Sequence, residues 1–226
     1  MKPGSFIIWG TLVSVLGLNL FSPELAEPAD QRPTKMTTIL ILGDSLTDGF
    51  GLTREEAYPA LIGEKMRAAK YRGEVINAGS SGDTTGDALA RLSSLLHRKR
   101  LDILILALGI NDAFRGVPVE EMRANLQAII DQTRERYPAV AIVIAGMRFP
   151  VATGNGYVEA FEGMYGRLAE QNQAELVTNL LEGVAANPAL NQLDLIHPNA
   201  AGQRILAENV WRVLEPMLAK KARATD

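Results

Sequence analysis

Short runs rich in Ile, Leu and Val constrain the fold of this chain more than any other feature of its sequence. They lie at residues 38–42, 74–77, 101–108, 140–145 and, more weakly, 175–177. Two of them are nearly continuous in these residue types, which is typical of strands that helices cover on both faces. The runs therefore predict a parallel sheet of about five strands.

Helical patterns separate these runs. Apolar residues recur at the spacing of one helix face in two segments. They are Met122, Leu126, Ile129 and Ile130 in the first segment, and Leu206, Val210, Val213, Leu214 and Met217 near the C-terminus. The alternation of strands and helices predicts an α/β fold, a three-layer α/β/α sandwich with a central parallel sheet. Such sheets bind ligands at the carboxyl ends of their strands.

The N-terminal residues 1–35 differ from the rest of the chain. Residues 3–23 carry no charge and include a long apolar stretch, whereas residues 23–35 are polar and contain three Pro. This pattern predicts an export signal or, because about 20 apolar residues can cross a bilayer, a membrane anchor, followed by a linker. We therefore expect residues 36–226 to form the domain of an exported protein that is periplasmic or secreted, or tethered to a membrane by its N-terminus.

Composition excludes several classes of protein. With 47% hydrophobic and 22% charged residues, the chain is typical of one ordinary globular domain. Its net charge of −3 comes with no basic stripe, so we expect no nucleic-acid partner. The sequence has no Cys, which excludes disulfides, thiol nucleophiles and iron–sulfur sites, and its two His are too few for a His-rich metal site. We expect a monomer without a metal or a cofactor.

Polar, glycine-containing turns follow three of the predicted strands. They read GDSLTDG at 43–49, GSSGDT at 79–84 and GIND at 109–112. Because ligands bind at the carboxyl ends of parallel strands, we expect these turns to converge on one edge of the sheet. Further along, Asp194 and His197 stand three residues apart, directly before the last predicted helix. Their side chains would share one face if that turn were helical.

One set of residues resembles the motif blocks of the SGNH (GDSL) hydrolase superfamily. Its members are Ser45, Gly82, Asn111 and His197, together with Asp194. The four blocks occur in the family's order, and the resemblance extends over residues 37–218. Residues 147–150 and 157–168 also resemble the bacterial multifunctional thioesterase, protease and lysophospholipase branch and the arylesterases. The resemblance implies a flavodoxin-like SGNH hydrolase fold and hydrolysis of carboxylic esters or thioesters through an acyl-enzyme intermediate.

The same residues suit serine catalysis on chemical grounds. A serine hydroxyl is a weak nucleophile and needs an adjacent base, and His197 is the candidate base for Ser45. Asp194 would accept the other imidazole N–H and stabilise the imidazolium. The backbone N–H groups of Ser45 and Gly82 and the side-chain amide of Asn111 would form an oxyanion hole for the negative charge that develops on the acyl oxygen.

Apolar residues on the loops beside this site predict a groove for the medium or long acyl chain of a small-molecule ester or thioester. They are Ile110, Phe114, Phe149, Pro150, Val151 and Tyr157. Ile110 stands where the thioesterase-like branch usually has Gly, which would narrow the cleft beside Asn111. An arylesterase, a lysophospholipase and an acyl-CoA thioesterase are all compatible with these residues. A carbohydrate O-acetyl esterase of the same superfamily is the main alternative.

Other interpretations of single residues remain open. Ser45 and Asp194 could cap helices, and Asn111 could be a turn former. We expect His97 to lie at the surface or at a helix end, without a role. Four carboxylates near strand ends could instead hold Mg²⁺ in a phosphotransfer protein, namely Asp44, Asp48, Asp83 and Asp112, although we expect Asp44 to tie down its own loop. A catalytically inert binding module would be expected to lack Ser45 or His197, and both are present.

Overall fold

The structure is a computed structural model that describes residues 1, 36–149 and 156–223. The chain divides into two units, Met1–Gln31 and Arg32–Asp226, and the described helices and strands all belong to the second unit. The predicted export signal or anchor lies outside the described residues. Among those that are described, no helix is both long enough and apolar enough to cross a membrane.

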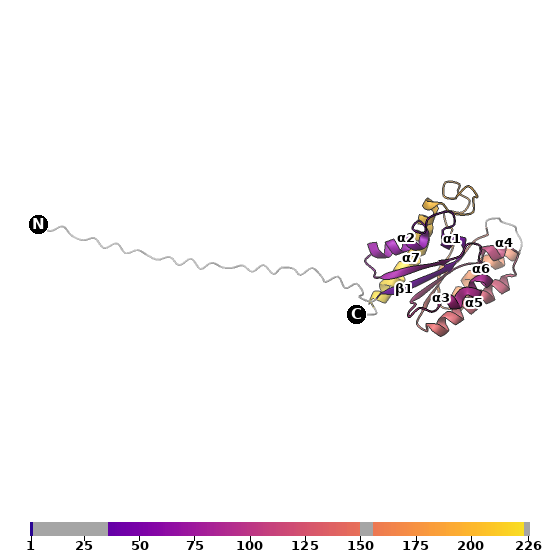
Figure 1. The fold of residues 1–226 in the computed structure, drawn as a ribbon, viewed down its shortest axis with the longest axis horizontal. Helices are drawn as coiled ribbons and strands as arrows, with labels where there is room; N and C mark the ends of the chain where they lie inside the picture. Colours follow the sequence, from indigo (N-terminus) through magenta and orange to yellow (C-terminus); the bar gives the residue numbers. More distant parts are fainter. Residues whose placement is uncertain (2–35, 150–155, 224–226) are drawn as a thin grey trace. The chain divides into compact units, whose positions relative to one another are not determined.

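Within the described residues, five parallel strands form one sheet in the order β2-β1-β3-β4-β5 (Figure 1). Their bounds are Thr37–Gly43 (β1), Gly73–Gly79 (β2), Ile103–Ala107 (β3), Ala141–Ala145 (β4) and Glu175–Val177 (β5). The central strands β1 and β3 are buried along their whole length, whereas the edge strands β2 and β5 contain exposed residues. The predicted parallel sheet is confirmed, and burial on both faces explains why the central strands are so apolar.

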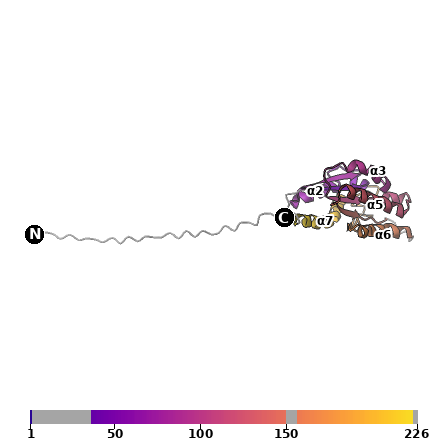
Figure 2. The same ribbon diagram turned by 90° about the horizontal axis from the view of Figure 1, so that it is seen from below.

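The helices cover both faces of this sheet. Their bounds are Ser45–Asp48 (α1), Tyr58–Ala68 (α2), Thr85–Leu95 (α3), Ile110–Phe114 (α4), Val119–Arg136 (α5), Gly156–Gln171 (α6) and Ala200–Arg223 (α7). Helices α2 and α7 pack together on one face, and α3, α5 and α6 cover the other (Figure 1, Figure 2). This is the predicted three-layer α/β/α sandwich, and its strand order is that of flavodoxin-like folds.

The predicted apolar stripes of two helices face the core. Met122, Leu126, Ile129 and Ile130 of α5 are buried, as are Leu206, Val210 and Leu214 of α7. Val213 and Met217 at the margin of the second stripe are half-buried and pack against the core. The apolar run predicted at 101–108 gives a shorter strand, because Leu101 and Leu108 are buried without joining the hydrogen-bonded ladder.

The register of the sheet brings the carboxyl ends of three strands level with one another. Gly43 at the end of β1 is paired with Gly79 of β2 and with Ala107 of β3. The three polar turns that follow these strands therefore begin side by side, as their positions in the sequence predicted. These turns carry three of the predicted site residues, Ser45, Gly82 and Asn111.

Candidate active site

Ser45 is the first residue of α1, a single helical turn that directly follows β1. Asp44 caps this turn, because its Oδ1 accepts a hydrogen bond from the backbone N–H of Leu46 at 3.0 Å. The backbone N–H groups in the first turn of a helix have no intrahelical acceptor. The turn therefore presents both the hydroxyl and the backbone N–H of Ser45 at the carboxyl edge of the sheet.

Ser45, His197 and Asp194 form a continuous chain of hydrogen bonds. His197 Nε2 lies 3.0 Å from Ser45 Oγ, and His197 Nδ1 lies 2.6 Å from Asp194 Oδ2. Hydrogen bonds from the side chain and the backbone of His197 lower the pKa of Asp194 to about 2. Asp194 is therefore ionised at neutral pH and holds the imidazole with its Nδ1 protonated and its Nε2 directed at the serine.

The turn that holds Asp194 and His197 differs from the helical turn considered in the sequence, because residues 194–197 form bends and turns. Asp194 Oδ1 accepts hydrogen bonds from the backbone N–H groups of Ile196 and His197, each at 3.0 Å. These bonds bring the carboxylate to the imidazole without a helix. The side chain of Asn199, and not that of Asp194, accepts hydrogen bonds from backbone N–H groups in the first turn of α7.

Gly82 and Asn111 meet across the turns after β2 and β3. The Asn111 side-chain amide donates to the backbone carbonyl of Asp83 at 2.9 Å, so Asn111 is fixed against the residue that follows Gly82. Gly82 has a φ of +88°, which L side chains rarely adopt, while no atom within 4 Å would meet a Cβ there. Backbone conformation, and not crowding inside the protein, is therefore what calls for glycine at this position.

Arg91 connects the backbones of these turns, although no role was predicted for it. Its Nε donates to Asp83 Oδ2 at 2.6 Å, and its Nη2 donates to the carbonyls of Ala78 at 2.8 Å and Gly43 at 3.3 Å. One guanidinium thus holds the ends of β1 and β2 and the residue to which Asn111 is bonded. The available signal was an arginine directly before the buried Leu92 of α3.

A cavity of about 220 Å³ opens beside Ser45 and His197. Its other lining residues are Leu46, Ile110, Asn111, Phe114, Arg148, Leu181, Ala185, Ala186, Leu195 and Ile196. The lining is mainly apolar, which suits the acyl part of an ester. Of the residues predicted to bind substrate, Ile110 and Phe114 line this cavity. The sequence reasoning missed Leu181, Leu195 and Ile196, although two of these lie in the turn between Asp194 and His197.

Two other residues predicted to bind substrate, Phe149 and Tyr157, are described and do not line this cavity. Phe149 packs behind Phe114, with ring centroids 5.5 Å apart, and is half-buried. Tyr157 donates its hydroxyl to the backbone carbonyl of Val117 at 2.7 Å, so it supports the segment after α4. Pro150 and Val151 lie outside the described residues. The sequence shows that these residues are apolar, but it does not show in which direction their side chains point.

Phe50 contacts the imidazole from outside the cavity. Its ring centroid lies 4.5 Å from that of His197, and its side chain is 48% exposed. The side-chain amide of Gln192 donates to the Phe50 carbonyl at 2.6 Å, which ties the segment after α1 to the turn that carries His197. His97, by contrast, is exposed just after the end of α3, as expected.

The four carboxylates considered for Mg²⁺ are engaged separately. Asp48 accepts a hydrogen bond from Ser81, Asp83 pairs with Arg91, and Asp112 accepts hydrogen bonds from Thr85. Each of these carboxylates therefore has a different partner in the protein. Asp44 is fully buried, its Oδ2 has no hydrogen-bond partner among the described residues, and burial raises its pKa to about 7. Among the residues that the structure describes, no group of three or more His, Cys, Asp or Glu is placed to hold a metal ion.

Comparison with known proteins agrees with this arrangement. Residues 41–205 match the model of the GDSL-like Lipase/Acylhydrolase family. The chain is 34% identical to an arylesterase of Vibrio mimicus, over 90% of this chain and 98% of that protein. It is 32% identical to thioesterase 1/protease 1/lysophospholipase L1 of Escherichia coli K12, over 83% of this chain and 88% of that protein. A crystal structure of TesA superposes with a TM-score of 0.75 at 35% identity, covering 80% of this chain and 99% of that one.

The chain therefore belongs to the GDSL-like lipase/acylhydrolase family, and the resemblance found in its sequence is confirmed. It is a serine ester hydrolase with the α/β sandwich of the SGNH hydrolases. Small-molecule esters and thioesters are the substrates that fit this family.

Proposed function

We propose that Ser45 is the nucleophile of this hydrolase, that His197 is its general acid and base, and that Asp194 orients His197. The observation that carries the proposal is the hydrogen-bonded chain from Asp194 through His197 to Ser45 Oγ. In the first step His197 Nε2 takes the proton from Ser45 Oγ as that oxygen attacks the acyl carbon. The imidazolium then gives this proton to the departing alcohol or thiol, which leaves an acyl-enzyme on Ser45.

The second half of the reaction uses the same groups with water. His197 Nε2 accepts a proton from a water molecule that attacks the acyl carbon, and returns it to Ser45 Oγ as the carboxylic acid leaves. Throughout, Asp194 accepts the Nδ1 hydrogen bond and stabilises the transient imidazolium. Its low pKa supports this role, because the carboxylate stays charged.

The oxyanion hole that we propose consists of the backbone N–H groups of Ser45 and Gly82 and the side-chain amide of Asn111. An amide side chain has two N–H donors, and Asn111 uses one of them for the Asp83 carbonyl. The bond to Asp83 thereby fixes the plane of the amide and leaves its second N–H for the substrate. Donors held in place before the reaction stabilise the developing charge without reorganisation.

For the acyl group we propose the apolar cavity beside Ser45, lined by Ile110, Phe114 and the newly found Leu181. Its volume of about 220 Å³ is below the roughly 300–1,000 Å³ of typical pockets for drug-sized ligands. The cavity therefore suits a short or medium acyl chain, and the remainder of a longer chain would extend past the exposed side chains at its mouth. Phe149 and Pro150 remain proposed contacts for that outer part, and Tyr157 a support for the loop beside it.

The direct test is hydrolysis of a p-nitrophenyl ester series from acetyl to palmitoyl, with acyl-CoA thioesters alongside, and Ser45→Ala as the control. We expect activity that is lost in Ser45→Ala and a chain-length optimum at short or medium esters. An optimum confined to acetyl, with activity on acetylated sugars, would instead indicate a carbohydrate O-acetyl esterase. A Ser45→Ala variant as active as the wild type would contradict the assigned nucleophile.

We also propose that residues 1–35 direct export of a monomeric domain formed by residues 36–226. The uncharged apolar stretch within residues 3–23 supports this proposal. Intact mass of the protein recovered from periplasmic, culture and membrane fractions distinguishes a cleaved signal from a retained anchor. Recovery of the whole chain in the cytosolic fraction would contradict export.

A further inference from the structure

Exposed apolar side chains gather at the mouth of the cavity beside Ser45. Apart from Met1 and Met36, the exposed large hydrophobic residues in the described part of the chain are Phe50, Phe114, Leu193, Leu195 and Ile196. We call these five residues the apolar rim. Scattered single apolar residues are ordinary on a protein surface, but a group of them in one place usually marks a contact with something else.

The rim is continuous with the catalytic residues. Phe114, Leu195 and Ile196 line the same cavity as Ser45 and His197. Phe50 does not line this cavity, but its ring centroid lies 4.5 Å from that of His197. Whatever covers the rim must therefore either supply the substrate or block access to Ser45.

The two leucines of the apolar rim contribute little to the stability of the fold. Leu193 is fully exposed, at 104% of its reference area, so its side chain takes no part in the core. Leu195 has a φ of +58° and is 56% exposed. A left-handed backbone disfavours a leucine, and glycine or asparagine would suit this turn better. These leucines are thus better explained by a contact outside the protein than by packing inside it.

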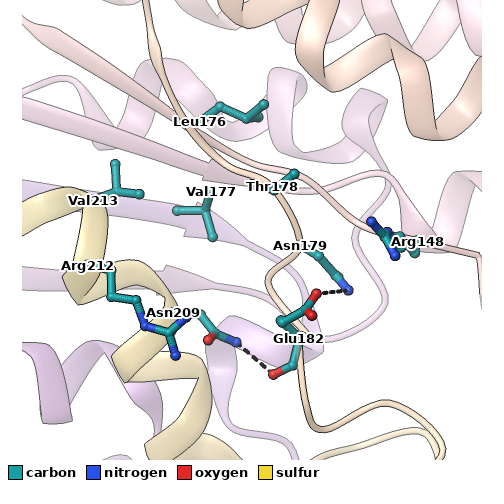
Figure 3. A pocket seen from close by; sticks show the side chains of 9 residues that line it. All are labelled: Arg148, Leu176, Val177, Thr178, Asn179, Glu182, Asn209, Arg212 and Val213. Carbon is teal, nitrogen blue, oxygen red and sulfur yellow. Dashed lines mark hydrogen bonds between the residues drawn. The ribbon is translucent and has the colours of Figure 1, made fainter.

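A cation flanks the apolar rim. Arg148 lines the cavity beside Ser45 and also a second, more polar cavity of about 470 Å³, which includes Thr178, Asn179 and Glu182. In Figure 3 the Arg148 side chain lies on the opposite side of this second cavity from Arg212. Arg148 is exposed and has no ion-pair partner among the described residues. The mouth therefore combines apolar side chains with a guanidinium that is unpaired among the described residues, and these groups can contact acyl chains and phosphate headgroups respectively.

We propose that the apolar rim docks on the surface of a phospholipid membrane, with Arg148 contacting headgroup phosphates, so that acyl substrates pass from the membrane into the cavity beside Ser45. This proposal deepens the proposed function and rests on its acyl cavity. A membrane is the occupant that the observations favour, because it covers the rim and supplies the cavity at the same time. A second copy of the chain, or its own N-terminal stretch, would cover the rim and block the cavity.

The test compares two full-length variants in a Ser45→Ala background, which prevents turnover. Leu193→Ser removes the rim leucine that does not line the cavity, and Met36→Ser is the matched control at the amino end of β1, where Met36 is 50% exposed. The probe is sedimentation with vesicles of phosphatidylcholine and phosphatidylglycerol in equal parts. We expect Leu193→Ser to lower vesicle binding about tenfold, the effect of removing one leucine from an apolar contact, while Met36→Ser leaves binding unchanged.

Arg148→Gln in the same background gives a second reading. It is expected to weaken binding to these anionic vesicles by about fivefold and to have less effect at high salt. Equal binding by Leu193→Ser and its parent would overturn the proposal, because vesicle binding would then come from another part of the chain. Light scattering that shows a dimer which Leu193→Ser converts to a monomer would assign the rim to a second copy and overturn it too.

Measurements of esterase activity distinguish a failure of membrane docking from a failure of the proposed catalytic function. With Ser45 restored, Leu193→Ser should hydrolyse a soluble short-chain p-nitrophenyl ester within about twofold of the wild-type rate, since Leu193 does not line the cavity. It should need more vesicle surface to reach half of its maximal rate on a monoacyl phospholipid. If Ser45→Ala were fully active yet bound vesicles through Leu193, the proposed nucleophile would be wrong while the docking surface stood.

Discussion

Asn111 and Asp83 are joined by a hydrogen bond of 2.9 Å from the Asn111 side-chain amide to the Asp83 carbonyl. The bond links the turn after β3 to the turn after β2, and it orients the only side-chain donor of the proposed oxyanion hole. A donor aligned before substrate binds stabilises the transition state more than one that must rotate into place.

We therefore expect Asn111→Ala to reduce kcat by roughly 100- to 1,000-fold with a small change in KM, because the lost donor acts mainly in the transition state. Steady-state kinetics on a soluble p-nitrophenyl ester give both constants. Asn111→Asp is the matched variant, since it keeps the size of the side chain but replaces the donor with an acceptor. Wild-type kcat in either variant would remove Asn111 from the oxyanion hole.

We expect Arg91 to affect the catalytic rate by positioning the turns around the active site, and not by contacting the substrate. Its guanidinium holds the Gly43 and Ala78 carbonyls together with the Asp83 carboxylate, so Arg91→Lys loses the geometry of these bonds but keeps the charge. A displacement of about 1 Å at the reacting groups can lower the rate by about 100-fold. We expect a fall in kcat that exceeds the change in KM, with thermal unfolding still cooperative.

A structural role alone would give a different pattern for Arg91. In that case Arg91→Lys would lower the thermal midpoint while kcat at a permissive temperature stayed at the wild-type value. Asn111→Ala combined with Arg91→Lys provides the sharper check, because two changes that act through one donor should be less than additive. Additive losses would show that Arg91 does not act through Asn111.

The raised pKa of Asp44 predicts how the free energy of unfolding depends on pH. Burial raises the pKa of Asp44 to about 7 from an ordinary value of 3.8, so the folded protein binds this proton more tightly than the unfolded chain. The stabilisation is complete below about pH 4 and is lost as pH rises through about 7, with a total of roughly 4 kcal/mol for about three pKa units. We expect the unfolding free energy of the wild type, relative to that of Asp44→Asn, to fall over this range.

Urea unfolding of both proteins at several pH values between 4 and 8 measures this difference. Asn keeps an oxygen that can accept the Leu46 N–H but does not titrate, so it is a close control for Asp44. Parallel curves for the two proteins would mean that Asp44 does not change its protonation on folding.

Metal removal distinguishes serine catalysis from the Mg²⁺ alternative. The proposed reaction uses only groups of the protein itself and no metal ion, so EDTA should leave esterase activity unchanged. Activity that disappears with EDTA and returns with Mg²⁺ would point to the carboxylates at the strand ends. A matched measurement with Asp48→Asn would then locate the ion, since Asp48 lies beside Ser81 at the edge of the site.

Much of the fold followed from local pattern. The buried strands β1 and β3 are apolar on both faces, and Met122, Leu126 and Ile129 mark the buried face of α5 at helical spacing. Both patterns arise from burial, because buried positions take apolar residues at the spacing of the strand or helix that carries them. The family resemblance added the pairing of Ser45 with a histidine 152 residues away, which no local spacing predicts.

What the sequence could not predict depends on contacts between distant segments. Tyr157 has the apolar character of a substrate contact, yet its hydroxyl is bonded to Val117. The position of Phe50 against His197 depends on how two separate loops meet, and the contacts of Arg91 depend on the ends of β1 and β2 meeting beside the turn that carries Asp83. Leu195 was visible as an apolar residue in a polar turn, but its positive φ was not.

The most direct test of the central claim is to find where a serine-reactive fluorophosphonate attaches. The account predicts one adduct per chain, on the peptide that contains Ser45, with loss of esterase activity in proportion to labelling. Ser45→Ala should take up no label, and Asp194→Asn should label much more slowly because His197 is no longer held as a base. An adduct on another serine, or full esterase activity in the fully labelled protein, would contradict the account.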